Sequence, residues 1–439
     1  MKHSIFVLGV VATSLMAGCE RQEPLLTGER ESLRSVLSEG DPSQVAEAPG
    51  SAAIRLPAQV LNASWTHRIG SPKYRTSHPQ LSSTPSLAWS ADIGAGDSRK
   101  NRITADPVAA DGRIFTLDAE AQVTATSVQG ETLWQADLTP LRDKAGEGTG
   151  GGLAYADNII YVASGFGLLT AFDAATGDLI WEQKLGATGS GAPTVYGNLI
   201  YIVSGDDTAW ALDTKTGRIR WQLGATEDVS NVLGGAAPAV NDKFVVFPYG
   251  DGGLHGAFRK GGLRLWSSFV SGARRFDTIS TVTDITGDPV IVGDTVYVGS
   301  HSGRLVAMDV NTGKRNWTVG EGALSPVWPI AGALFVLSDR NELVRLNAED
   351  GSRVWGVNLP NLKKFKQRKA NEVFAHYGPI VAGGQVILAS NDGVLRFFDP
   401  VDGTLIRTVD VPGGATTAPI VANGTLYVVG AKGQLHAFR

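Results

Sequence analysis

The sequence predicts an all-β protein, an eight-bladed β-propeller of four-stranded antiparallel blades over residues 87–439. Three observations predict it. A unit of four short strands recurs along the chain, a tryptophan stands in the last strand of almost every unit, and the two ends of the repeat region complete one another. The composition agrees, because 54 glycines and 43% hydrophobic residues in a chain of 439 suit many short strands and tight turns around a large core.

Residues 1–18 predict a lipoprotein signal peptide. A basic residue precedes an apolar stretch that is too short to span a bilayer. Cys19 is the only cysteine and follows Ala17 and Gly18, and this stretch resembles a bacterial lipoprotein box, which implies a lipidated thiol. Glu20 is not the aspartate that favours inner-membrane retention, so the resemblance implies the outer membrane. The alternative is an ordinary cleaved signal with an incidental cysteine.

The next two segments lead into the repeats. Residues 19–60 are polar and contain several prolines, which predicts a flexible tether. Residues 61–86 contain Trp65 and Tyr74, so we expect this pre-propeller segment to pack across the outside of the domain.

Residues 287–319 show the repeating unit most clearly. Four short runs of β-branched, aromatic and aliphatic residues alternate with turns rich in Gly, Asp and Asn. Such turns need residues that tolerate positive φ. One such unit cannot bury its hydrophobic faces alone, so the prediction depends on how often it recurs.

The unit recurs eight times. A proline or its equivalent marks the first strand at Pro107, Leu153, Pro193, Pro238, Pro289, Pro326, Pro379 and Pro419. A glycine closes the last hairpin at Gly130, Gly177, Gly217, Gly262, Gly313, Gly351 and Gly403. The last strand then carries Trp134, Trp181, Trp221, Trp266, Trp317, Trp355 and, as the exception, Arg407. A spacing of roughly 44 residues lies within the range of propeller blades.

The two ends of the repeat region predict how the ring closes. The eighth unit stops after its third strand, residues 434–438, while residues 87–92 resemble a fourth strand without a blade and carry Trp89. Joining this N-terminal strand to the C-terminal blade closes the ring. A closed ring leaves no open sheet edge between its ends.

The pattern of first-strand proline, Thr-Gly turn and last-strand tryptophan resembles the tryptophan-docking repeat of pyrroloquinoline quinone (PQQ) dehydrogenases. The resemblance implies that each tryptophan stacks between adjacent blades and that its N–H meets a backbone acceptor. It also raises one alternative function, a periplasmic PQQ-dependent dehydrogenase or a ligand sensor, with the cofactor and calcium over the propeller axis.

The residues for such chemistry are not evident. One cysteine cannot form the adjacent-cysteine disulfide frequent in those enzymes, the repeat aspartates fall in turns, and the seven histidines are dispersed. No nucleophile elbow or phosphate loop is present. A net charge of −4 provides no basic field for nucleic acid. We therefore expect no catalysis, no cofactor and no metal site.

A lipoprotein box, a tether and eight lean blades together resemble the BamB family, the propeller lipoproteins of the outer-membrane β-barrel assembly machinery. The resemblance implies a non-catalytic scaffold, lipid-anchored at the periplasmic face of the outer membrane. It implies binding to the POTRA domains of BamA, the central barrel subunit, with unfolded outer-membrane proteins as clients.

By their order along the chain, the BamA-contacting loops of that family correspond to residues 226–235 and 271–288. The first loop would present the apolar residues Val229, Val232 and Leu233. The second would present Arg274, Arg275, Phe276, Asp277 and Asp284, and arginines beside an aromatic residue are typical of interface hot spots. The alternative is that both loops are ordinary surface connections.

Residues 362–370 form a basic stretch between the sixth and seventh units. Lys363, Lys364, Lys366, Arg368 and Lys369 surround Phe365. We interpret it as a solvated basic loop, with an acidic partner surface or anionic headgroups as the alternative; binding that weakens strongly with salt would favour the latter.

Overall fold

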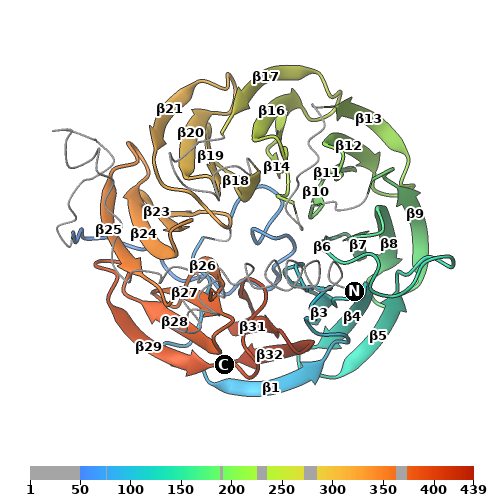
Figure 1. Ribbon diagram of the computed structural model, residues 1–439, viewed down its shortest axis with the longest axis horizontal. Coiled ribbons are helices and arrows are strands. Elements are labelled where there is room, and N and C mark those ends of the chain that lie inside the picture. Colours follow the sequence, from blue (N-terminus) through green and yellow to red (C-terminus); the bar gives the residue numbers. More distant parts are fainter. Residues whose placement is uncertain (1–49, 76, 188–190, 225–234, 271–283, 362–372) are drawn as a thin grey trace, which may run out of the picture. The chain divides into compact units, whose positions relative to one another are not determined.

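The computed structural model describes residues 50–75, 77–187, 191–224, 235–270, 284–361 and 373–439. Apart from Val373, these residues belong to one compact unit, Glu47–Asn361 with Phe374–Arg439. This unit contains eight four-stranded sheets, and every strand pairs antiparallel with its neighbour. The sheets follow one another around a common axis, as Figure 1 shows in the order of the colour bar. The predicted eight-bladed propeller is confirmed.

The strands are short, and those of a blade follow each other in the chain. Blades 1 and 2 contain β2 (Val108–Ala110), β3 (Arg113–Leu117), β4 (Gln122–Ser127), β5 (Thr132–Asp137), β6 (Gly151–Ala156), β7 (Ile159–Ser164), β8 (Leu168–Asp173) and β9 (Leu179–Lys184). Blades 3 and 4 contain β10 (Thr194–Tyr196), β11 (Leu199–Val203), β12 (Thr208–Asp213), β13 (Ile219–Gly224), β14 (Ala239–Val240), β15 (Phe244–Pro248), β16 (Gly253–Phe258) and β17 (Arg264–Phe269).

The second half of the ring repeats this arrangement. Blades 5 and 6 contain β18 (Ile285–Val292), β19 (Thr295–Ser300), β20 (Arg304–Asp309), β21 (Arg315–Val319), β22 (Trp328–Ile330), β23 (Ala333–Leu337), β24 (Glu342–Asn347) and β25 (Arg353–Asn358). Blades 7 and 8 contain β26 (His376–Ala382), β27 (Gln385–Ser390), β28 (Val394–Phe398), β29 (Leu405–Asp410), β30 (Ile420–Ala422), β31 (Thr425–Gly430) and β32 (Gln434–Phe438).

Blade 8 takes its fourth strand from the start of the repeat region. β1 (Leu87–Asp92) pairs antiparallel with β32, and Trp89 lies opposite Ala437. Two backbone hydrogen bonds between Ser86 and Arg439 extend the pairing. In Figure 1 the blue β1 and the red β32 lie side by side. The N-terminal strand therefore closes the ring as the sequence predicts.

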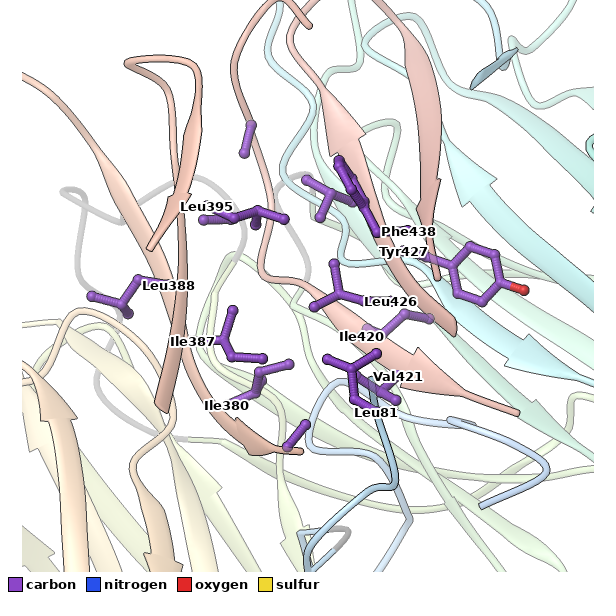
Figure 2. Close-up of a cluster of buried hydrophobic side chains, with 14 of the residues drawn as sticks. Leu81, Ile380, Ile387, Leu388, Leu395, Ile420, Val421, Leu426, Tyr427 and Phe438 are labelled. Atoms are coloured by element: carbon purple, nitrogen blue, oxygen red, sulfur yellow. The ribbon is translucent and has the colours of Figure 1, made fainter. Parts of the chain in front are cut away.

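The core lies between the blades. Inner strands such as β11 are fully buried, whereas the outermost strands alternate between exposed and half-buried residues because solvent covers one face. Figure 2 shows one cluster, in which Ile387 of blade 7 faces Val421 and Leu426 of blade 8. Leu81, from the segment before the propeller, lies against Val421 in the same cluster and is 5% exposed.

The tryptophans connect each blade to the next. Trp134 of blade 1 lies against Gly177 of blade 2, where an added Cβ would lie 2.7 Å from the indole and φ is +79°. The same pairing joins Trp89 to Gly130, Trp181 to Gly217, Trp221 to Gly262, Trp266 to Gly313, Trp317 to Gly351 and Trp355 to Gly403. Both the left-handed backbone and the ring contact therefore require glycine at the end of the hairpin.

The indole N–H groups meet backbone acceptors in the next blade, as expected, with one exception. Trp266 Nε1 donates to Val310 O at 2.9 Å, three residues before the glycine that the ring contacts. The corresponding carbonyl for Trp221 belongs to Arg259, and it accepts from Tyr201 Oη at 3.0 Å. Trp221 Nε1 has no acceptor among the described residues, and its ring is only half-buried.

Arg407 replaces tryptophan for a reason that the ring closure explains. The last-strand side chain of each blade packs on the final hairpin of the next blade, but blade 8 has no such hairpin, because β32 and β1 come from opposite ends of the repeat region. Arg407 therefore has no glycine to stack on. Its guanidinium lies over the ring of Phe397 in its own blade, 3.9 Å from the centroid.

Antiparallel order gives the propeller two distinct faces. The turns between first and second strands and between third and fourth strands lie at one end, which we call the hairpin face. The turns between second and third strands lie at the other end, together with the connections between blades, and we call it the connection face. Most of the two predicted partner loops, residues 226–235 and 271–288, lies outside the described ranges, and residues 285–288 belong to strand β18 and not to a loop.

Candidate functional site

The segment before the propeller contacts the inner strands of the blades. The prediction that residues 61–86 pack across the outside of the domain is therefore wrong. We call residues 60–75 and 77–81 the axial segment. It bonds to every blade in turn, through Ala109, Tyr155, Val195, Asp242, Asp288, Val327, Gly383 and Asn423. Figure 1 shows this blue segment inside the ring of strands. Residues assigned to the tether also contact blades, since Ala52 N donates to Val401 O at 3.3 Å.

Arg68 of the axial segment joins two blades on opposite sides of the ring. Its Nε lies 3.1 Å from Asp106 of blade 1, and its Nη1 lies 2.9 Å from Asp288 of blade 5. Both carboxylates also accept backbone N–H bonds, from Ala418 at 2.8 Å and from Ala237 at 3.1 Å. Burial lowers the pKa of Arg68, but Asp288 and Asp106 outweigh it, so the net pKa is raised. The guanidinium therefore stays charged between the two acids.

A second arginine fixes the axial segment to blade 6. Arg75 is 8% exposed and donates from Nε to Val327 O at 2.8 Å and from Nη2 to Pro326 O at 2.6 Å. Its guanidinium lies 4.6 Å from the ring centroid of Trp328, which stacks in turn with Trp65. Hydrogen bonds to carbonyls and an aromatic face compensate the buried cation.

These contacts bear on whether the axis could hold a metal ion or a cofactor. Calcium and a quinone cofactor would need free carboxylate oxygens at the axis. Asp106 and Asp288 are instead bonded to Arg68 and to backbone N–H groups, although Asp288 Oδ2 has no hydrogen-bond partner among the described residues. Across the described ranges, no group of three or more His, Cys, Asp or Glu side chains could hold a metal ion. Arg68 therefore places its own positive charge between the two acids, where a calcium ion would have to compete with it.

The structure brings the ends of the two predicted partner loops together. Ala237 follows the first loop, Asp288 ends the second, and their 3.1 Å hydrogen bond joins blade 4 to blade 5. Thr286 Oγ1 donates to Ala323 O at 2.6 Å and so fixes the second loop to the connection after blade 5. The described residues at the C-terminal ends of the two predicted loops are therefore joined to each other.

Asp284, within the second predicted loop, is buried and does not lie on the surface. It is 4% exposed, and its backbone forms a hydrogen bond with His301. Burial lowers the pKa of His301, and this hydrogen bond partly offsets the effect. A residue with so little exposed area supports the loop and is unsuited to a partner contact that needs a free side chain.

The other predicted functional residues lie outside the described ranges. They are Cys19, Val229, Val232, Leu233, Arg274, Arg275, Phe276, Asp277 and the basic stretch 362–370. Their roles stay predictions.

Sequence reasoning missed Asp106, Asp288 and their partner Arg68, although a signal was present. The residue before the first-strand proline is Gly, Ala or Ser in the other units, because it lies close to the neighbouring blade. Only units 1 and 5, on opposite sides of the ring, have Asp before the first-strand proline, at Asp106–Pro107 and Asp288–Pro289. Two acids at equivalent inner positions predict a shared cation.

The attachment of the axial segment is expected to weaken in acid because of His67. Val195 N donates to its Nε2 at 3.0 Å, which requires an unprotonated acceptor, and burial lowers the pKa of His67 to about 3. The unfolded chain binds the proton from pH ~6.5 downward, so this residue costs up to about 1.4 kcal/mol of stability per pH unit between 6.5 and 3. The measurement is urea unfolding from pH 7 to pH 4.

The matched variant for this test is His67→Gln, which keeps an acceptor for Val195 N–H but does not titrate. We expect it to reduce the pH dependence of the unfolding free energy while the other buried histidines retain theirs. An identical pH dependence in the variant and the wild type would contradict this assignment.

The fold and the tryptophan–glycine pairing define the class of protein: a closed propeller of tryptophan-docking repeats, with a segment of its own chain bonded to every blade inside the ring. The family profile of outer membrane protein assembly factor BamB matches residues 119–357 and 368–439, and the chain belongs to this family. No helix in the described part of the chain is both long and apolar enough to cross a membrane.

Two curated relatives carry the same family name. Outer membrane protein assembly factor BamB of Shewanella oneidensis is 24% identical over 361 residues, which cover 80% of this chain and 88% of the relative. The Escherichia coli K12 protein of that name is 27% identical over 359 residues, or 81% and 88% of the two chains.

Two solved structures share the fold. The crystal structure of BamB from Moraxella catarrhalis has a TM-score of 0.66 at 20% identity and covers 81% of this chain and 100% of that one. A europium-containing methanol dehydrogenase has a TM-score of 0.62 at 15% identity, with 86% and 98% coverage.

Proposed function

We propose that this protein is a non-catalytic scaffold in the assembly of outer-membrane β-barrel proteins. The observation that carries the proposal is the family match across the propeller, since the relatives are named outer membrane protein assembly factors. The Arg68 contacts with Asp106 and Asp288 support the absence of quinone chemistry. Similarity to a methanol dehydrogenase at 15% identity concerns the fold alone.

The finer proposal concerns the anchor and the partner. Residues 1–18 direct export, Cys19 carries the lipid, and residues 19–60 lead from the outer membrane to the propeller on its periplasmic face. The loops at 226–235 and 271–288 bind the POTRA domains of BamA. Their support is the order of these loops along the chain, which resembles that of the family, together with the hydrogen bond between Ala237 and Asp288 at their C-terminal ends.

Affinity capture from solubilised outer membrane tests the partner proposal. The double variant Arg275→Glu, Phe276→Ala is expected to reduce co-purification of the barrel subunit by at least tenfold, because arginine and aromatic anchors dominate interface energies. Asp284→Arg is a poor test, because Asp284 is 4% exposed and its reversal would disturb the fold.

The matched control is Arg142→Glu, Leu141→Ala. It makes the same kind of change at exposed residues in another connection between blades. Retained capture with Arg275→Glu, Phe276→Ala would contradict the loop assignment. A clear thermal shift on adding PQQ and calcium would contradict the non-catalytic scaffold.

A further inference from the structure

Blade 4 carries a basic and apolar patch on the hairpin face. We call it the rim patch, and it comprises the turns at residues 241–243 and 258–263 together with Lys73 and Tyr74 of the axial segment. The two turns are joined, because Arg259 N donates to Lys243 O at 3.0 Å and Arg259 Nε donates to Asp242 O at 2.9 Å.

The charges of the rim patch are mostly positive. It contains Lys73, Lys243, Arg259 and Lys260, with Asp242 as its acid. Lys73 Nζ pairs with Asp242 at 2.9 Å, which neutralises one cation and leaves three. Lys243 and Lys260 are both exposed at the tips of their turns. The patch therefore presents a local positive field on a protein whose net charge is −4.

Exposed apolar side chains lie among these cations. Leu263 is 66% exposed, Tyr74 is 59% exposed and Phe258 is 41% exposed. The ring of Phe258 packs on Phe244 with centroids 5.5 Å apart, so the turn has a rigid base. Lysine and arginine next to exposed aromatic and aliphatic residues are typical of surfaces that lie against lipid headgroups.

The N-terminal segment reaches the propeller on the same face. Ala52 bonds to Val401 in the last hairpin of blade 7, and Asn62 O accepts from Asn423 N in the first hairpin of blade 8 at 2.8 Å. The first described residues of the chain therefore lie against the hairpin face.

We propose that the rim patch binds anionic phospholipid headgroups and so orients the hairpin face toward the membrane. The inference rests on the proposed function, because it assumes a chain attached to the outer membrane through Cys19. Charge and apolar contact act together here: the cations attract anionic headgroups, and Leu263, Tyr74 and Phe258 enter the interface.

Vesicle co-sedimentation tests the proposal with the chain from residue 19 onward carrying Cys19→Ser, so that no acyl chain contributes. We expect binding to vesicles of phosphatidylethanolamine with phosphatidylglycerol, weaker binding to phosphatidylcholine, and loss of binding at high salt. Each lysine near an anionic surface contributes roughly fivefold to the partition coefficient, so Lys243→Gln, Lys260→Gln should lower it roughly 25-fold. Leu263→Ser should lower it further.

The matched control is Arg142→Gln, Lys144→Gln, which removes two exposed cations from the connection face. It should leave vesicle binding unchanged. Equal binding to both kinds of vesicle, or an equal loss in the control, would overturn the proposal. In the lipidated chain, the variant Lys243→Gln, Lys260→Gln should still capture the barrel subunit. The variant Arg275→Glu, Phe276→Ala should still bind vesicles. Failure of the scaffold role and failure of the lipid contact are therefore distinguishable.

Discussion

Trp266→Ala is expected to lower the free energy of unfolding by about 3–5 kcal/mol, the usual range for removing a buried tryptophan. Trp266 is 8% exposed, packs on Gly313 of the next blade and donates to Val310 O at 2.9 Å. The substitution removes a large apolar contact between blades 4 and 5 and leaves the carbonyl without its donor. Urea unfolding followed by far-ultraviolet circular dichroism measures the loss.

Trp221→Ala provides the matched control at the same position of blade 3. Trp221 is half-buried, and its N–H has no acceptor within the described residues, so its loss should be clearly smaller. Equal losses would show that the hydrogen bond and the deeper burial of Trp266 do not matter. A loss below about 1 kcal/mol for Trp266→Ala would contradict the docking role itself.

Arg68→Met should be comparably severe, because it leaves two buried carboxylates facing one another. Breaking a buried ion pair by removing one partner costs about 3–5 kcal/mol. The side chain of Asp288 is 1% exposed, and burial already raises its pKa. Without the cation this pKa rises further, so the deficit relative to wild type should shrink as the pH falls and the carboxyl is protonated. Unfolding of both proteins from pH 7 to pH 4 measures this difference.

Two variants separate the charge effect from a general loss of packing. Arg68→Met with Asp288→Asn removes one of the stranded charges and should recover part of the stability at pH 7. Lys73→Met removes a part-exposed cation of the same axial segment, whose partner Asp242 is exposed, and should cost at most about 1 kcal/mol. A deficit in Arg68→Met that is the same at every pH would contradict the electrostatic explanation.

Most of the propeller could be predicted from local patterns. The strand at Leu87–Asp92 and the last strand at Gln434–Phe438 have the predicted bounds, because alternating residues and turn chemistry depend on near neighbours in the chain. Trp266 and Gly313 could each be assigned to its repeat in the same way. That they contact each other across a blade boundary, and that Trp221 lacks an acceptor, required the packed ring.

The candidate site was less predictable because its contacts join distant parts of the chain. Arg68 and Asp288 are separated by 220 positions, and no local pattern pairs them. Asp284 had the right residue type for an exposed contact, but its burial depends on how blade 5 packs. The assignment of Arg275 and Phe276 to partner binding depends on resemblance and waits for the capture experiment.

The sequence alone determined the number of blades, the position of the strands and the closure by β1, because each is a repeated local pattern. Only the tertiary structure decided that the axial segment lies inside the ring, that Asp106 and Asp288 share Arg68, and that Arg407 has no glycine to stack on. The physical reason is that closing the ring brings blades 1 and 5 to one axis. Burial and charge pairing at the axis join residues that are far apart in the chain, so no local sequence pattern reveals them.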